Sequence, residues 1–167
     1  MNNKTYNNLL ALARAARGKI KMIYLHWTAG QHITNHIERA DYHICILGDG
    51  RIEIECDDLT ELRTHTWHRN TGAIGIALCC GLGATANNVY NADFGSYPIV
   101  LPIDKNCIMT HCEAALLDGY GPYSGDPETR WDLWYIDDPG TKEKMQPGGD
   151  VLRGLANWFK TMGIPIE

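Results

Sequence analysis

Two nearly continuous apolar runs constrain the fold of this chain more than any other feature of its sequence. The first covers residues 20–26 (IKMIYLH), and the second covers residues 74–80 (IGIALCC). Such runs are typical of strands that are buried on both faces in the middle of a sheet. We therefore expect both segments to be central strands of one sheet.

The remaining patterns predict a hairpin and several helices around these strands. Residues 42–47 and 51–55 alternate in polarity and flank Gly48-Asp49-Gly50, which is a strong hairpin signal. Helical spacing predicts a helix over residues 5–17, a short helical turn over 113–117 and a C-terminal helix over 151–159. Residues 81–105 and 119–127 show no clear period and are predicted to be mostly loop. The expected fold class is α/β with a central mixed β-sheet flanked by helices. We expect a single domain over residues 1–167, with a helix within residues 1–18 packing on the core.

Composition and charge exclude some functions. The chain has 167 residues, of which 44% are hydrophobic and 21% charged, as in an ordinary soluble globular protein. Its formal net charge of −5 offers no basic surface, so we expect no nucleic-acid partner. No apolar run approaches the ~20 residues of a membrane span, and the N-terminal segment lacks the hydrophobic stretch of a signal peptide. We expect synthesis in the cytoplasm, without a signal peptide and without membrane insertion.

Three residues far apart in the chain are candidate metal ligands. His26 ends the first apolar run, His111 lies in the segment MTHCE, and Asp132 lies in TRWDLW. A catalytic zinc site needs three protein ligands and one open position, and two histidines with one carboxylate are a common set. Taken singly, each histidine is more often a core or surface residue and the aspartate more often a turn or cap residue, so spacing alone does not establish a metal site. None of the six cysteines forms a C-x-x-C pair, which argues against a structural zinc knuckle.

Four segments that occur in order along the chain favour the metal interpretation. They are residues 23–30 (IYLHWTAG), 41–46 (DYHICI, before the hairpin turn), 65–70 (HTWHRN, leading into IGI) and 110–113 (THCE). In this order the chain resembles the zinc-dependent N-acetylmuramoyl-L-alanine amidases, the family of phage amidase lysozymes and peptidoglycan recognition proteins. The resemblance covers roughly residues 20–160. It implies a mixed sheet with a groove over one face, and a Zn²⁺ ion bound by His26, His111 and Asp132.

The resemblance also implies catalytic roles. The expected reaction is hydrolysis of the amide between the lactyl group of N-acetylmuramic acid and L-alanine of peptidoglycan. Tyr42 matches a tyrosine that phage relatives use, and Arg130 stands where they carry a lysine. Arginine is suited to stabilise an oxyanion but not to donate a proton, and its alternative role is a surface ion pair with Asp126 or Glu128.

The general base is open between two residues. One branch of the family places a glutamate where this chain has Ala77, which leaves Tyr42 or Glu113. We expect Glu113 more readily to support a ligand histidine. Cys112 competes with Asp132 as the third ligand, but it should point away from the metal if the segment around His111 is extended.

Other residues match the substrate groove of relatives. His65 is expected to hydrogen-bond the peptide or the oxyanion, and Asn70 to contact substrate or fix a loop. Aromatic faces suit sugar rings, although they also serve as packed walls of a cleft; the candidates are Trp27, Trp67 and Trp131. Relatives carry a long helix between the IGI strand and the second zinc histidine, but residues 81–109 show no helical period.

We expect peptidoglycan to be the binding partner. We also expect the protein to act as a monomer. A phage or prophage endolysin released through a holin-type lesion fits best, with a secreted effector or a recycling enzyme as less favoured settings. The alternatives to an amidase are a non-catalytic peptidoglycan-binding domain and a zinc peptidase that cuts within the stem peptide.

Overall fold

A five-stranded mixed sheet forms the centre of the computed structural model, which describes residues 3–83, 108–127, 129–137 and 145–161. The strands run in the order β3-β2-β4-β1-β5, and their bounds are β1 Met22–Trp27, β2 Ile44–Ile46, β3 Ile52–Ile54, β4 Ala73–Leu78 and β5 Ile108–Thr110. Strands β2, β4, β1 and β5 are parallel, and β3 pairs antiparallel with β2 at one edge. The predicted mixed α/β class is confirmed, and the two apolar runs are the adjacent strands β1 and β4.

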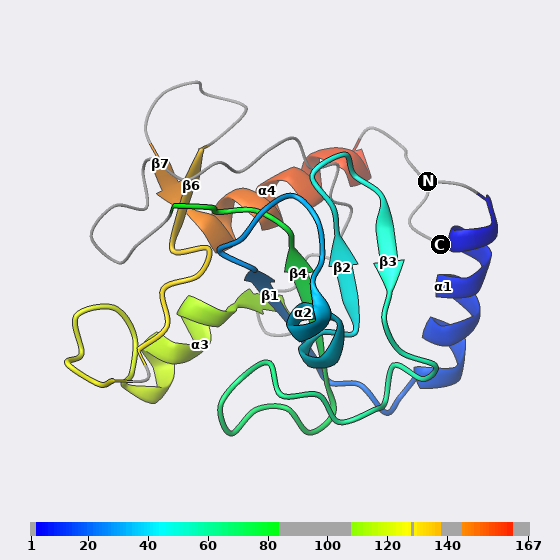
Figure 1. Ribbon diagram of the computed structural model, residues 1–167, viewed down its shortest axis with the longest axis horizontal. Helices are drawn as coiled ribbons and strands as arrows, with labels where there is room; N and C mark the ends of the chain where they lie inside the picture. Colours follow the sequence, from blue (N-terminus) through cyan, green and yellow to red (C-terminus); the bar gives the residue numbers. More distant parts are fainter. Residues whose placement is uncertain (1–2, 84–107, 128, 138–144, 162–167) are drawn as a thin grey trace.

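In the described part of the chain, four helices and a small second sheet lie around this core (Figure 1). The helices are α1 Asn3–Ala16, α2 His36–Asp41, α3 His111–Asp118 and α4 Gly148–Thr161. Strands β6 Tyr135–Asp137 and β7 Met145–Pro147 form an antiparallel pair. Figure 1 shows α1 beyond the β3 side of the sheet and α3 at the opposite, β5 side. No helix among the described residues is long and apolar enough to cross a membrane.

The two faces of the central sheet differ in side-chain size. Side chains alternate between faces along a strand, and one face carries large apolar groups that belong to the main core, among them Leu25, Trp27, Ile74, Ile76 and Leu78. Leu9 and Leu12 of α1, and Val151 and Leu152 of α4, pack against that core. On the opposite face, Tyr24 and His26 of β1 lie beside Gly75 and Ala77 of β4. The small residues leave room there for imidazole rings.

The hairpin is confirmed, while two segments differ from expectation. Gly50 adopts a φ of 81° in the turn between β2 and β3, where glycine avoids the strain of a side chain. The segment after Thr110 is helical from His111, not extended, because Thr110 and Glu113 form a reciprocal capping box. Helix α2 was not predicted, although Asn35 and Glu38 form the same kind of box. The predicted loop at 81–105 and the absence of a helix there fall largely on residues 84–107, outside the described residues.

We expect Gly75→Ala to destabilise the fold, because an added Cβ would lie 2.6 Å from Cγ of His65. The imidazole ring is buried and has little room to shift, so the cost should be about 1–3 kcal/mol in the free energy of unfolding, measured by urea denaturation. Gly154→Ala in α4 is the matched control. A Cβ there meets nothing within 4 Å, and the change should be neutral or slightly stabilising. Equal stability of the two variants would contradict the packing described.

Candidate metal centre

The ends of two neighbouring parallel strands and one turn bring three buried ligands together. His26 lies near the carboxyl end of β1, His111 begins α3 directly after β5, and Asp132 lies in the turn before β6. One ligand atom from each residue lies within 4.8 Å of the others. Nδ1 of His26 is 3.2 Å from Oδ2 of Asp132, and Nδ1 of His111 is 3.4 Å from Oδ1. The predicted metal ligands therefore form one cluster. Cys112, the alternative third ligand, follows His111 directly in the sequence.

The turn that carries Asp132 is held under local strain. Trp134 N–H donates to the carbonyl oxygen of Trp131 (3.0 Å), and between them Leu133 has a φ of 57°, a conformation that bulky residues rarely adopt. Leu133 is 0% exposed, and its burial in the main core offsets the strain. Gly148 N–H at the start of α4 donates to the Trp134 carbonyl (2.9 Å). Core packing and α4 thus fix the carboxylate beside the two histidines.

The charge states of these groups suit a cation. Burial lowers the pKa of His26 below its ordinary value, although Asp132 acts in the opposite direction, so the ring is neutral at pH 7. Burial by itself raises the pKa of Asp132, but His111 and then His26 outweigh it and hold the pKa below its ordinary value. The neutral ring of His26, the ionised carboxylate of Asp132 and the imidazole of His111 make up a donor set that zinc takes in proteins. The residues present therefore fit a zinc ion, and the donor set does not by itself fix the identity of the metal.

An open cleft of about 510 Å³ lies over the cluster. His111 and Asp132 line it, and so do all five predicted substrate-binding residues, His65, Asn70, Trp27, Trp67 and Trp131. Trp67 is 61% exposed, whereas Trp27 is buried and contacts Trp131 edge to face with ring centroids 5.3 Å apart. Trp27 and Trp131 therefore form a packed wall, whereas Trp67 stays largely exposed although its ring meets that of His68, with centroids 4.5 Å apart. Sequence reasoning did not single out Ala29, Asp41 and Thr129, which also line the cleft.

Tyr42 and Arg130 both reach this cleft. The Tyr42 ring packs against His26 with centroids 5.0 Å apart. Burial and then Asp132 raise the pKa of Tyr42 far above its ordinary value, so its hydroxyl keeps its proton at neutral pH and can donate a hydrogen bond to a ligand in the cleft. Arg130 is half-buried, and its Nη1 donates to the Thr129 carbonyl (3.2 Å). Its permanent charge lies two residues from the candidate ligand Asp132.

Glu113 is not brought into the cleft. Its Oε2 accepts hydrogen bonds from Thr110 N–H (2.8 Å) and from Arg153 Nη1 (2.9 Å), and its Oε1 accepts from Arg153 Nη2 (2.6 Å). Gly149 at the start of α4 covers the carboxylate so closely that a Cβ there would lie 2.3 Å from Oε2. Glu113 is thus the cap of α3 and an anchor of α4, and this placement lends no support to its predicted catalytic role.

Cys112 is also directed away from the cluster, although for another reason than the one predicted. It follows His111 in the first turn of α3 instead of in an extended segment, and its side chain is buried. It lines a neighbouring cavity with Glu113 and Leu133, not the cleft over His111. Burial raises the pKa of its thiol to about 12, which disfavours the thiolate that a metal requires.

Thr66, which the sequence analysis did not select as a functional residue, lies beside the candidate ligand His26. Its Oγ1 is 3.4 Å from Nε2 of His26 and 3.0 Å from Nδ1 of His65. Asn70 fixes this position, because its Oδ1 accepts a hydrogen bond from Thr66 N–H (2.7 Å). Asn70 therefore orders the loop that supports His26, in addition to lining the cleft. The only sequence signal for Thr66 was its place in the HTWHRN segment.

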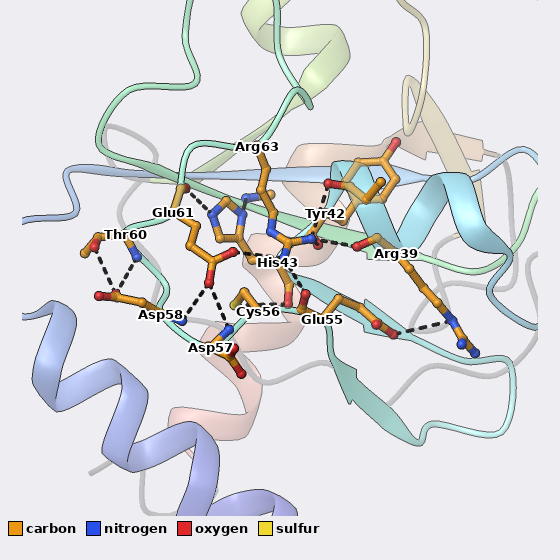
Figure 2. Close-up of polar contacts among 12 residues, drawn as sticks. Arg39, Tyr42, His43, Glu55, Cys56, Asp57, Asp58, Thr60, Glu61 and Arg63 are labelled. Atoms are coloured by element: carbon orange, nitrogen blue, oxygen red, sulfur yellow. Dashed lines mark hydrogen bonds and ion pairs between the residues drawn. The ribbon is translucent and has the colours of Figure 1, made fainter.

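The loop that carries His65 and Thr66 is tied down by Arg63 (Figure 2). The Arg63 guanidinium donates to Glu61 Oε2 (3.0 Å) and to four backbone carbonyl oxygens, those of Arg39, Ala40, Tyr42 and Glu55. Three of these carbonyls lie at the C-terminal end of α2, where a positive charge also stabilises the helix dipole. Arg63 thus joins α2, the end of β3 and the cleft loop.

His43 supports the same loop from the sheet. Gly75 N–H donates to its Nδ1 (3.1 Å), so the ring proton lies on Nε2, which donates to the Glu61 carbonyl (2.9 Å). Burial lowers the pKa of His43, in keeping with this neutral form. Its ring meets that of His65 edge to face, with centroids 5.6 Å apart. His43 is therefore structural.

Comparison with known proteins adds no relative: no family model, no curated protein and no solved structure matches this chain.

We expect Arg63→Met to destabilise the protein by about 2–4 kcal/mol, because it leaves the part-buried carbonyls of Tyr42 and Glu55, and the Glu61 carboxylate, without their donor. Urea denaturation followed by circular dichroism measures the change. Arg51→Met is the control: Arg51 pairs with Asp49 on the exposed hairpin turn, and its loss should leave stability nearly unchanged. Equal effects of the two substitutions would contradict the role of Arg63 in holding the cleft loop.

The buried histidines predict a pH dependence of the metal-free protein. The pKa of His65 is lowered by burial, and further by His26, to about 3, from an ordinary value of 6.5. Below pH 6.5 the unfolded state binds a proton at this position and the folded state does not, so stability falls as the pH is lowered. His65→Gln should reduce the slope between pH 6.5 and 5 by up to about 1.4 kcal/mol per pH unit. His36→Gln on the exposed face of α2 serves as control, and identical slopes for wild type and His65→Gln would contradict the assignment.

Proposed function

We propose that this chain is a zinc-dependent hydrolase that cleaves the amide between N-acetylmuramic acid and L-alanine in peptidoglycan. The observation that carries the proposal is the buried cluster of His26, His111 and Asp132 at the floor of an open cleft. An ordinary structural role for these residues would not require three metal-ligand atoms within 4.8 Å of one another beside open space. The choice of this bond comes from the resemblance of four ordered segments to the amidase family.

The three ligands would hold the metal, and the chain's own groups would handle the charge that develops on the substrate. A zinc ion bound there would supply a water of pKa about 7 and would polarise the amide carbonyl. Around the same cleft, Arg130 offers a fixed positive charge and Tyr42 a protonated hydroxyl. Groups of this kind, positioned in advance, stabilise the oxyanion of a tetrahedral intermediate. We assign both residues to that role.

The rim of the cleft is suited to a glycan strand with an attached peptide. Trp67 presents an exposed aromatic face, which suits the apolar face of a sugar ring. Trp27 and Trp131 form a firm wall, and His65 and Asn70 add polar atoms deeper in the cleft. We further propose an amidase-like arrangement of the fold, action as a monomer, and the setting of a phage or prophage endolysin that reaches the cell wall through a membrane lesion.

Replacing a ligand should abolish hydrolysis without unfolding the chain. We expect Asp132→Asn to lower the rate of peptidoglycan digestion at least about 100-fold, because the anionic ligand is lost. Zinc removal by a chelator should have the same effect, and added zinc should reverse it. His36→Ala, an exposed histidine outside the cleft, is the matched control and should keep full activity.

The products separate the proposed reaction from its alternatives. Mass analysis should find free stem peptides that begin with L-alanine, together with intact glycan strands. Fragments cut between two amino acids would show a zinc peptidase instead. Tight binding of peptidoglycan with no products, in a zinc-loaded sample, would show a recognition domain.

A further inference from the structure

The Thr66 hydroxyl lies between two buried imidazole rings and can transmit the direction of a hydrogen bond from one to the other. Its oxygen is within hydrogen-bonding distance of Nε2 of His26 and of Nδ1 of His65. Thr66 is 1% exposed, so water does not compete for it. A hydroxyl has one proton, and it therefore donates to one ring while it accepts from the other.

The two rings differ in the surroundings of their second nitrogen. Nδ1 of His26 faces the Asp132 carboxylate at 3.2 Å. Nε2 of His65 is buried and makes no hydrogen bond of regular geometry among the described residues, although the backbone of Ala73 interacts with the ring. The chain His26–Thr66–His65 thus runs from the candidate metal ligand to a buried nitrogen of a residue that lines the cleft.

We propose that Thr66 is a positioning residue that couples cation binding at His26 to the hydrogen-bonding character of His65. The inference rests on the proposed metal site but not on the identity of the substrate. Without a cation, the proton on Nδ1 of His26 bonds Asp132, and Nε2 accepts from the Thr66 hydroxyl. The hydroxyl oxygen then accepts from Nδ1–H of His65, and Nε2 of His65 is left as an acceptor.

A cation on Nδ1 of His26 reverses every bond in this chain. The ring proton then lies on Nε2 of His26 and is donated to Thr66, whose hydroxyl turns to donate to Nδ1 of His65. The proton of His65 moves to Nε2. His26, Thr66 and His65 each hold one of these protons in both arrangements. Protons exchange with water during the change, but the number bound to the three groups stays the same. In the loaded state Nε2 of His65 carries an N–H and is a hydrogen-bond donor instead of an acceptor.

The direct test is the tautomer of His65, read from ¹⁵N chemical shifts of the imidazole nitrogens in the whole protein without substrate. We expect His65 to carry its proton on Nδ1 in the presence of a chelator and on Nε2 after one equivalent of zinc is added. The same tautomer in both samples, with zinc bound, would overturn the inference.

Three variants test the part played by the hydroxyl. Thr66→Val keeps the shape of the side chain but removes the hydroxyl, and should weaken zinc affinity about 10–100-fold in a chelator competition, as loss of a ligand's hydrogen-bond partner does. Thr66→Ser should restore most of the affinity and the tautomer change. Thr34→Val is the control, because it removes a hydroxyl that bonds Glu53, and neither residue lines the cleft; zinc affinity should be unchanged.

The outcomes separate this inference from the proposed function. If the wild type binds zinc and Thr66→Val binds it equally well, the role of Thr66 is wrong and the metal site stands. If the wild type binds no zinc, the proposed function fails and the inference fails with it. If Thr66→Val does not fold, the tautomers of the wild type and of Thr66→Ser decide.

Discussion

The burial of the Asp132 carboxylate between two imidazole rings is the constraint on which the account depends. An ionised carboxylate removed from water costs several kcal/mol unless charge or hydrogen bonds compensate it. His26 and His111 approach both of its oxygens, and the turn that carries Asp132 is held by the buried Leu133 and by the first residues of α4. A divalent cation at this point would balance the carboxylate and use the lone pairs of both rings.

The sheet makes room for this arrangement. Large side chains of β1 and β4 fill the core on one face, and Gly75 and Ala77 leave the other face open for the rings of His26, His43 and His65. Arg63 and His43 then fix the loop above that face, and Thr66 brings the loop into contact with His26. Stability and function thus share the same residues, because the contacts that order the loop also orient a candidate ligand.

The central strands, the hairpin and the candidate metal ligands could be predicted, because local sequence patterns indicate them. The two apolar runs predicted the central strands, the Gly48–Gly50 turn predicted the hairpin, and the metal cluster matched the three residues chosen from motifs. Helix α2 and the helical start at His111 had readable signals, the capping pairs Asn35–Glu38 and Thr110–Glu113, which went unused. The roles of Thr66 and Arg63 were beyond local patterns, since their partners lie up to 40 residues away. Glu113 was assigned from its nearness to His111 in sequence, whereas its carboxylate is directed to Arg153.

The identity of the ligands around a bound ion tests the central claim most directly. X-ray absorption at the zinc edge, on protein loaded with one equivalent of zinc, reports the kinds of atoms that surround the metal. We predict only nitrogen and oxygen neighbours at about 2.0–2.1 Å, from two imidazoles, one carboxylate and water. A sulfur neighbour at about 2.3 Å would assign the site to a cysteine, and failure to retain stoichiometric zinc would remove the metal centre altogether.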